Sequence, residues 1–218
     1  MPVRQVTNAM GNNVCYFPSI KMRRMIGCES LTERDYVYLI DYDDAVEEFE
    51  EQPVKIPYRV GGKGRLIWYP PDFRVRYADR AEMVDVKPAG FRETDKDRDK
   101  FEAARAWCAE HGLVFRIVTA DEITAGYRLV NVQFLTLFAR HDTDRQIKAA
   151  VLELLADADA ALTLGQLTRQ LAATGISPSP RRDLLQMAFR HEIAIAIDDA
   201  KIGAATPVRL PTPRRSRS

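Results

Sequence analysis

The sequence has few of the residues that cross-link small secreted domains or bind zinc. Its three cysteines (Cys15, Cys28 and Cys108) and its three histidines are scattered over 218 residues. An odd, dispersed set predicts neither a disulfide framework nor a zinc site, and it favours a reducing cytoplasm. The sequence also lacks a signal-peptide pattern and any apolar run long enough to cross a bilayer.

Neither sign of charge dominates, because the formal net charge is +1. The charge is instead local: residues 41–51 are strongly acidic, and residues 213–218 form a basic tail. A hydrophobic content of 46% with 29% charged residues is ordinary for a folded protein. A chain of 218 residues can hold one domain of fair size and a small one.

Two stretches, residues 66–75 and 83–88, combine β-forming residues with charges that a strand seldom tolerates. We interpret them as two short strands that carry Asp72 in the first and Asp85 and Lys87 in the second. Asp85 and Lys87 alternate with valines, so both charges point to one face of the strand. Two carboxylates and a lysine on one side of a small sheet are costly unless something binds there.

Pro-Asp followed by Asp-x-Lys is the spacing of metal-dependent phosphodiester nucleases. Asp72 and Asp85 would hold a divalent cation together with the carbonyl of Val86, and Lys87 would orient the attacking water or stabilise the transition state. The alternative is an exposed Asp–Lys pair, and such a match arises by chance in roughly one chain in twenty.

The chain before this motif predicts a helix from Leu31 that ends near Asp43. Ser30 and Glu33 fit a capping box in which Glu33 reaches back to the Ser30 amide. Residues 46–58 have the pattern of a β-strand that is interrupted at Gln52-Pro53. Residues 61–64 have the pattern of a hairpin turn.

The chain after the motif predicts a helix that begins at Thr94 or Asp95 and runs to His111. A buried strand at residues 113–118 follows, and a helix followed by a strand predicts a crossover beside the Asp85 strand. A helix at about residues 128–140 closes this part of the chain.

The pattern changes after Thr143. Three helical patterns are followed by two strand patterns, at residues 192–197 and 201–210. This is the element order of a winged helix, in which Arg181 and Arg182 at the start of the third helix would face DNA. A small interaction bundle with solvated arginines is an equally good interpretation.

Taken together, the sequence between about Tyr16 and Arg140 resembles the TnsA family, the endonuclease subunit of heteromeric cut-and-paste transposases. The resemblance depends on six ordered blocks: Pro18-Ser19-x-Lys21, Glu29-Ser30-x-x-Glu33-Arg34-Asp35, Phe49-Glu50-Glu51-Gln52-Pro53, Tyr69-x-Pro71-Asp72-Phe73, Val84-Asp85-Val86-Lys87-Pro88 and Tyr127-Arg128-Leu129-x-Asn131.

The resemblance implies an α/β fold with a restriction-endonuclease-like core, a mixed sheet flanked by helices. It places the family's helix-borne glutamate on Glu33, its aspartates on Asp72 and Asp85 and its lysine on Lys87, and it favours the catalytic interpretation of Glu33 over the cap alone. The implied cofactor is Mg²⁺, for which Mn²⁺ substitutes, with Glu33, Asp72, Asp85 and the Val86 carbonyl as ligands.

The resemblance also implies a prokaryotic protein that cuts the 5′ ends of a transposon in double-stranded DNA. Its partners would be a DDE-type, TnsB-like transposase and an AAA+, TnsC-like regulator. We predict a nuclease domain at residues 1–141, a winged-helix-like domain at 142–210 and a flexible basic tail at 211–218. Candidate DNA contacts are Lys21, Arg23, Arg181 and Arg182. A stand-alone nuclease of repair or defence is the main alternative, and a non-catalytic DNA-binding module is a more distant one.

Overall fold

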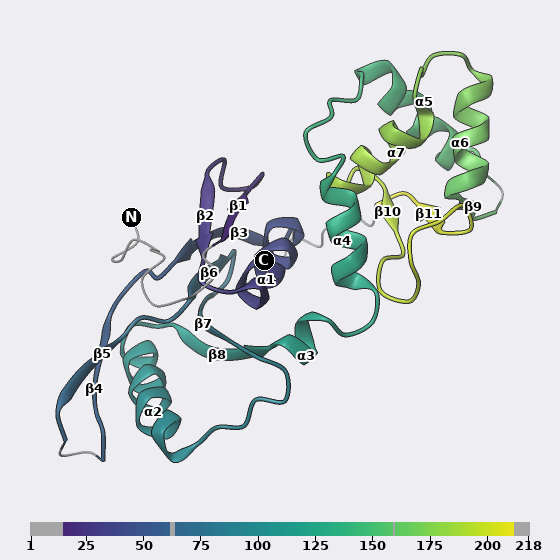
Figure 1. The fold of residues 1–218 in the computed structure, drawn as a ribbon. Coiled ribbons are helices and arrows are strands. Elements are labelled where there is room, and N and C mark those ends of the chain that lie inside the picture. The colour runs from purple at the N-terminus through teal and green to yellow at the C-terminus, as the bar shows by residue number, and fades with distance from the viewer. Residues whose placement is uncertain (1–14, 62–63, 159, 212–218) are drawn as a thin grey trace. The chain divides into compact units, whose positions relative to one another are not determined.

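The computed structural model describes residues 15–61, 64–158 and 160–211, and the chain folds as two compact units (Figure 1). Unit 1 spans Met1–Thr124 and unit 2 spans Ala125–Ser218. Two sequence predictions fall partly outside the described residues: the centre of the hairpin turn at residues 62–63, and the basic tail from residue 212 onward.

A four-stranded mixed sheet forms the centre of unit 1, in the order β3-β6-β7-β8. Its strands are β3 (Val46–Glu51), β6 (Phe73–Tyr77), β7 (Ala81–Lys87) and β8 (Val114–Thr119). β3, β6 and β7 are antiparallel neighbours, whereas β7 and β8 are parallel. Parallel neighbours need a crossover, which helix α2 (Asp95–Glu110) supplies. The predicted crossover beside the Asp85 strand is therefore confirmed, and the mixed α/β architecture fits a restriction-endonuclease-like core.

Helices α1 (Leu31–Tyr42) and α2 cover opposite faces of this sheet. Tyr36 of α1 packs on Phe73, whose ladder partner is Val84. Phe101 of α2 packs instead on the β8 residues whose ladder partners are Met83 and Asp85. Since alternate residues of β7 point to opposite faces, Asp85 points to the α2 side. A short helix, α3 (Ala120–Ile123), follows β8.

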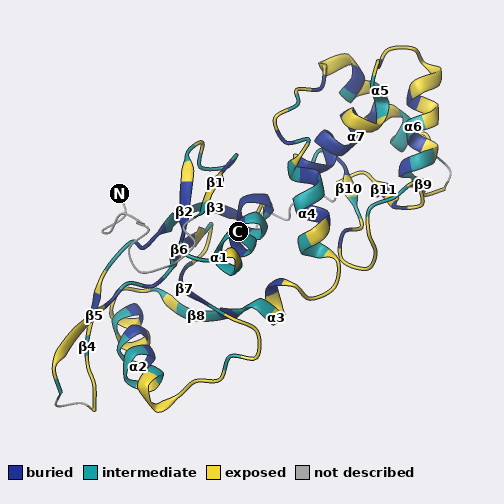
Figure 2. Cartoon of the chain, in the orientation of Figure 1, coloured by how far each residue is buried: buried dark blue, intermediate teal, exposed yellow. Residues whose placement is uncertain are grey.

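Two antiparallel pairs flank the sheet: β1 (Cys15–Pro18) with β2 (Met25–Cys28), and β4 (Ile56–Arg59) with β5 (Leu66–Tyr69). Cys15 and Cys28 are opposite each other in the first ladder, although they are distant in sequence, and all three cysteines are free thiols. Gly64 is required in the turn of the β4–β5 hairpin because a Cβ there would lie 2.3 Å from the Val60 carbonyl oxygen. Figure 2 shows that most of this hairpin is exposed.

Two strand predictions were wrong in detail. Residues 66–75 are not one strand, because Pro70 and Pro71 end β5 and the chain enters a different sheet as β6. Proline lacks the amide that a ladder needs, so the break follows from the sequence. β8 was predicted to be buried, yet Val114 is 54% exposed and only Val118 of this strand is fully buried.

Unit 2 contains α4 (Arg128–Thr136), α5 (Arg145–Ala156), α6 (Leu164–Ala173) and α7 (Pro180–Phe189), which surround a leucine-rich core. The predicted C-terminal hairpin is present as β10 (Ala194–Ile195) and β11 (Pro207–Arg209). A strand absent from the prediction, β9 (Leu162–Thr163), joins it in the order β10-β11-β9.

Unit 1 ends at Thr124, whereas the sequence analysis predicted a domain boundary after His141. Asn131 of α4 explains the difference. Its side-chain amide donates to the carbonyls of Ile197 and Ala200 at 2.7 Å, and its carbonyl accepts from the Ile202 amide at 2.9 Å. These bonds attach α4 to unit 2. Among the described residues, no helix is long and apolar enough to span a membrane.

Candidate active site

Asp72 occupies the link between β5 and β6, and its backbone and side chain are both held. Its carbonyl accepts from the Gln52 amide at 2.8 Å, just after β3 ends. Its carboxylate accepts from the Val86 amide at 2.6 Å. The N–H and C=O of one strand residue point to the same edge, so the Val86 carbonyl also faces Asp72. The fold thus brings together three predicted groups: Asp72, Val86 and the β7 strand that carries Asp85.

Asp85 is 1% exposed and has two close partners. The Tyr69 hydroxyl donates to Oδ1, and Lys87 Nζ forms an ion pair with Oδ2. Oδ2 accepts no hydrogen bond among the described residues, so its charge is balanced by the lysine alone. This pairing confirms that Asp85 and Lys87 share a face of β7.

Tyr69 and Lys100 are two neighbours of the site that the sequence analysis did not single out. Tyr69 is 7% exposed, and its ring packs edge-on against Phe101 at 6.4 Å. Lys100 Nζ lies 5.1 Å from the Tyr69 ring centre and 4.3 Å from that of Phe101. Tyr69 is part of a family-like block, which was the available signal; Lys100 lies on a charged helix turn that resembles any solvated surface.

Glu33 lies in the first turn of α1 and is partly buried. The predicted cap is present, with one difference. Ser30 Oγ accepts from the Glu33 amide at 3.1 Å and donates to Glu33 Oε1 at 2.9 Å. Glu33 Oε2, however, accepts from the Glu29 amide at 2.8 Å, where the sequence analysis expected the Ser30 amide.

The three carboxylates act on one another electrostatically. The pKa of Asp72 is raised well above its ordinary value by burial and then by the negative charges of Asp85 and Glu33. The pKa of Glu33 is also raised, mainly by burial, against the hydrogen bonds from Glu29 and Ser30 that lower it. Burial and the neighbouring Asp85 raise the pKa of Tyr69, which keeps its phenol a hydrogen-bond donor. Carboxylates of like charge thus lie within electrostatic range of one another in a partly dry site.

The donor set fits a hard divalent cation, since it consists of carboxylate and carbonyl oxygens and Mg²⁺ is commonly held by one or two carboxylates. Asp85 Oδ2, buried with only an ion pair, is an available ligand atom. Within the described residues, no three His, Cys, Asp or Glu side chains are grouped so that they could hold a metal. Asp72 and Asp85 are therefore the central pair, and Glu33, on the opposite helix, is peripheral to it.

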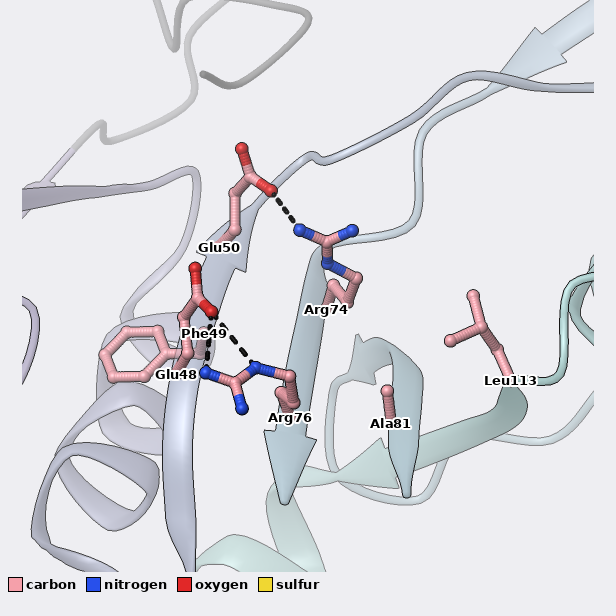
Figure 3. A pocket seen from close by; sticks show the side chains of 7 residues that line it. All are labelled: Glu48, Phe49, Glu50, Arg74, Arg76, Ala81 and Leu113. Atoms are coloured by element: carbon pink, nitrogen blue, oxygen red, sulfur yellow. Dashed lines mark hydrogen bonds and ion pairs between the residues drawn. The ribbon is translucent and has the colours of Figure 1, made fainter. Parts of the chain in front are cut away.

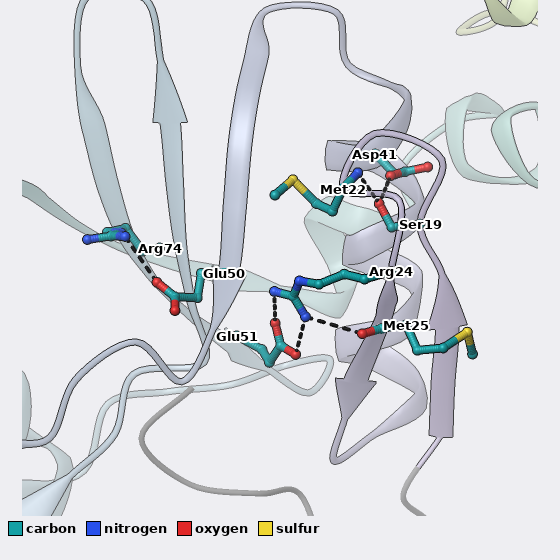
Figure 4. Close-up of polar contacts among 8 residues, drawn as sticks. All are labelled: Ser19, Met22, Arg24, Met25, Asp41, Glu50, Glu51 and Arg74. Atoms are coloured by element: carbon teal, nitrogen blue, oxygen red, sulfur yellow. Dashed lines mark hydrogen bonds and ion pairs between the residues drawn. The ribbon is translucent and has the colours of Figure 1, made fainter. Parts of the chain in front are cut away.

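Ser19 and Lys21 both have structural contacts, and Figure 4 shows those that Ser19 makes with Asp41 and Met22. Asp41, buried in α1, accepts from Ser19 Oγ and from the Ile20 and Lys21 amides, the amides at 3.1 Å. Lys21 Nζ donates to the carbonyls of Asp43 and Val46. The lysine predicted to contact DNA therefore holds the turn between α1 and β3.

The other predicted DNA contacts are at the surface. Arg23 is exposed at the turn between β1 and β2, where its φ is 52°. Arg181 and Arg182 are exposed in the first turn of α7 in unit 2. Within unit 1 the structure thus gathers Asp72, Asp85, Val86 and Lys87, with Glu33 near; Arg23 lies at a separate turn of this unit, and Arg181 and Arg182 belong to unit 2.

A hollow on unit 1 is lined by none of the predicted site residues or DNA contacts (Figure 3). Its walls include two strand-to-strand ion pairs, Arg74–Glu50 at 3.0 Å and Arg76–Glu48 at 3.0 Å. Because its arginines are already neutralised, the hollow offers no free charge for a substrate.

Comparison with known families gives one match. Residues 43–120 match the family model of the TnsA-like endonuclease N-terminal domain. The matched segment, well under half of the chain, contains Asp72, Asp85 and Lys87, but neither Glu33 nor unit 2. No curated protein matches the chain. The match confirms the resemblance to the TnsA-like endonuclease N-terminal domain over residues 43–120.

Proposed function

We propose that this chain is a metal-dependent DNA endonuclease that cuts the 5′ ends of a transposon as one subunit of a heteromeric transposase. The observation that carries the proposal is that the matched segment holds Asp72, Asp85 and Lys87 in one place, with Asp72 kept among like charges. Perturbed carboxylates of this kind are typical of sites whose charge is completed by a bound group.

The bound group would be Mg²⁺, or Mn²⁺ in its place, held by Asp72 and Asp85 with the Val86 carbonyl and with Glu33 as a further ligand. When bound, such a cation supplies a nucleophilic hydroxide at neutral pH and neutralises charge on the phosphate oxygens. Tyr69 fixes Asp85 by donating to Oδ1. This bond leaves Oδ2 for the ion pair with Lys87, and Oδ2 would be the oxygen available to a bound cation.

Lys87 acts on the phosphate and on the attacking water. Its side chain is 18% exposed, and Nζ lies 6.0 Å and 5.7 Å from the ring centres of Phe91 and Phe101. A cation held at a partly dry position stabilises the charge that grows on a phosphorane oxygen more than water does. The same ammonium can donate a hydrogen bond to the oxygen of the attacking water and so orient it.

The partners follow from the same proposal. A DDE-type transposase would recognise the transposon ends and cut the 3′ strands, and an AAA+ regulator would contact the complex. Unit 2 would be a winged-helix-like domain that holds DNA near the nuclease. The order helix, β9, helix, helix, β10, β11 and the exposed Arg181 and Arg182 support this part.

The test is strand-specific cleavage of a transposon-end duplex by the full chain, alone and with a DDE transposase encoded beside it, in Mg²⁺ or Mn²⁺. We expect 5′-strand cuts only with the partner, because the net charge of +1 gives the lone chain weak affinity for DNA. Asp72→Ala and Lys87→Ala should abolish cutting. Asp79→Ala, which removes a 68% exposed aspartate from the β6–β7 turn, should not.

An active Asp72→Ala or Lys87→Ala protein would refute the assignment of the site. Efficient, sequence-specific cutting by the chain alone would identify the stand-alone nuclease instead.

A further inference from the structure

The β4–β5 hairpin presents an apolar surface to solvent. Leu66, Ile67 and Trp68 are 43%, 38% and 57% exposed, and Val60 at the turn is 45% exposed. In the ladder Trp68 is opposite Pro57 and Leu66 is opposite Arg59. These two cross-strand pairs share the outer face, whereas Ile56 and Tyr69, on the other face, are buried. An exposed row of large side chains on a short hairpin is typical of a binding element.

The charge of the hairpin has one sign. Residues 54–69 contain Lys55, Arg59, Lys63 and Arg65 and no Asp or Glu. Lys55, Arg59 and Arg65 are exposed, and no ion pair between described residues involves them. Elsewhere in unit 1 the arginines of the sheet, such as Arg74 and Arg76, are paired with glutamates. The positive charge of the hairpin is therefore available to a polyanion.

The hairpin is attached firmly and directly to the candidate site. Its inner residues Ile56 and Tyr69 belong to the core cluster around Phe101 of α2. The Gly61 amide at its turn donates to the Asp99 carboxylate of the same helix at 2.7 Å. Tyr69, the last residue of β5, holds Asp85, and Asp72 follows after two prolines. A duplex with a phosphate at Asp72 and Asp85 must therefore pass close to the base of the hairpin.

From these observations we infer that the β4–β5 hairpin is a DNA-binding arm that grips the duplex beside the cut phosphate. This inference rests on the proposed nuclease function. Lys55, Arg59 and Arg65 contact backbone phosphates, and Trp68 with Leu66 packs on the sugars of a groove. DNA fits this surface better than a protein partner does, because exposed cations that form no ion pair with described residues match a regular array of phosphates.

The test measures binding without cutting. The full chain in metal-free, low-salt buffer is titrated against a fluorescently labelled duplex, and the affinity is followed as salt rises. Lys55→Gln/Arg65→Gln removes two exposed charges that form no ion pair with any described residue, so the fold should lose no stabilising contact. Arg74→Gln/Arg76→Gln removes the same charge from ion-paired, exposed strand positions and is the matched control.

We expect the hairpin double variant to lower the log–log salt slope by about two, and the affinity near 0.1 M salt by up to about eightfold for each lost phosphate contact. In the control variant, the salt slope and the affinity should each change by less than half as much as in the hairpin variant. Trp68→Ala should weaken binding several-fold with an unchanged salt slope, because it removes packing and no charge.

Equal losses in the hairpin and control variants would overturn the inference, because they would reflect net charge alone. Unchanged DNA binding in the hairpin variants would also overturn the inference. This holds as well if those variants bind the transposase more weakly, because the hairpin would then be a protein-binding element. The nuclease proposal is judged separately, by cleavage: hairpin variants that bind normally while the unaltered chain cuts would refute the arm only. If the hairpin variants lose DNA binding but the unaltered chain does not cut DNA under any condition, only the nuclease proposal would be refuted.

Discussion

Replacing Asp72 by asparagine should stabilise the metal-free protein at neutral pH. The Asp72 carboxylate has a raised pKa because of burial and the negative charges of Asp85 and Glu33. A carboxyl whose pKa is higher in the folded than in the unfolded protein stabilises the fold below its unfolded pKa of about 3.9. That contribution is lost as pH rises through the folded pKa. The ionised aspartate therefore lowers the free energy of unfolding at neutral pH, and replacing it by an uncharged amide removes this destabilisation.

Two effects of opposite sign decide the magnitude. Each unit by which the pKa is raised corresponds to about 1.4 kcal/mol of relief at neutral pH. Against this, the bond from the Val86 amide, 2.6 Å in length, changes from charge-assisted to neutral and loses about 1 kcal/mol. Because the pKa is raised well above its ordinary value, the relief exceeds the loss. A gain of about 1 kcal/mol raises Tm by roughly 2–4 °C in a chain of this size.

The assay is thermal unfolding of Asp72→Asn and the unaltered protein at about pH 7.5 and about pH 4, with and without Mg²⁺ or Mn²⁺. The variant should melt higher at neutral pH without metal, and its advantage should shrink in acid. Metal at tenfold excess over Kd should stabilise only the unaltered protein, by about 1.4 kcal/mol. Asp79→Asn, at an exposed turn, should show none of these changes. A variant that melts lower by the same amount at both pH values would refute the like-charge cluster.

Two further changes test other contacts. Tyr69→Phe removes the hydroxyl that donates to buried Asp85 Oδ1, so it should destabilise by about 1–3 kcal/mol in urea unfolding and reduce metal-dependent cutting; normal stability and normal cutting would show that the bond is dispensable. Arg181→Ala/Arg182→Ala should weaken DNA binding almost uniformly across sequences and lower the salt slope by about two if both contact phosphates; an unchanged slope would make unit 2 a docking module for a protein.

The sequence predicted the individual strands and helices better than it predicted which sheet each strand joins. Helix α2 was predictable because Thr94, a buried face and Gly112 marked its two ends and its inner side. The crossover then followed from connection rules. The sequence placed residues 66–75 in one strand, although Pro70-Pro71 held the contrary signal, because apolar and aromatic residues on both sides outweighed it. Which sheet a strand joins depends on contacts distant in sequence, and no local pattern reports them.

The domain boundary was harder to predict for the same reason. Residues 127–131 form one of the family-like blocks, so the sequence assigns them to the nuclease. Asn131 instead satisfies backbone groups of residues 197–202, which lie far away in the chain. A buried asparagine with three backbone partners is a strong tether. Nothing in residues 127–131 alone says where its partners are.

The family-like blocks also divide by role once their contacts are known. Ser19 and Lys21 fasten the β1–β2 turn to α1, and Gln52 holds the Asp72 carbonyl, so these blocks support the elements that carry the site. Glu33 belongs to both groups. Its two oxygens cap α1 through the Glu29 amide and Ser30, while burial and the negative charges of Glu29 and Asp85 raise its pKa. A cap needs only two of the four or so lone-pair positions of a carboxylate, so capping and metal binding are compatible for one glutamate. The capping bonds also fix its rotamer, which is what a peripheral ligand requires.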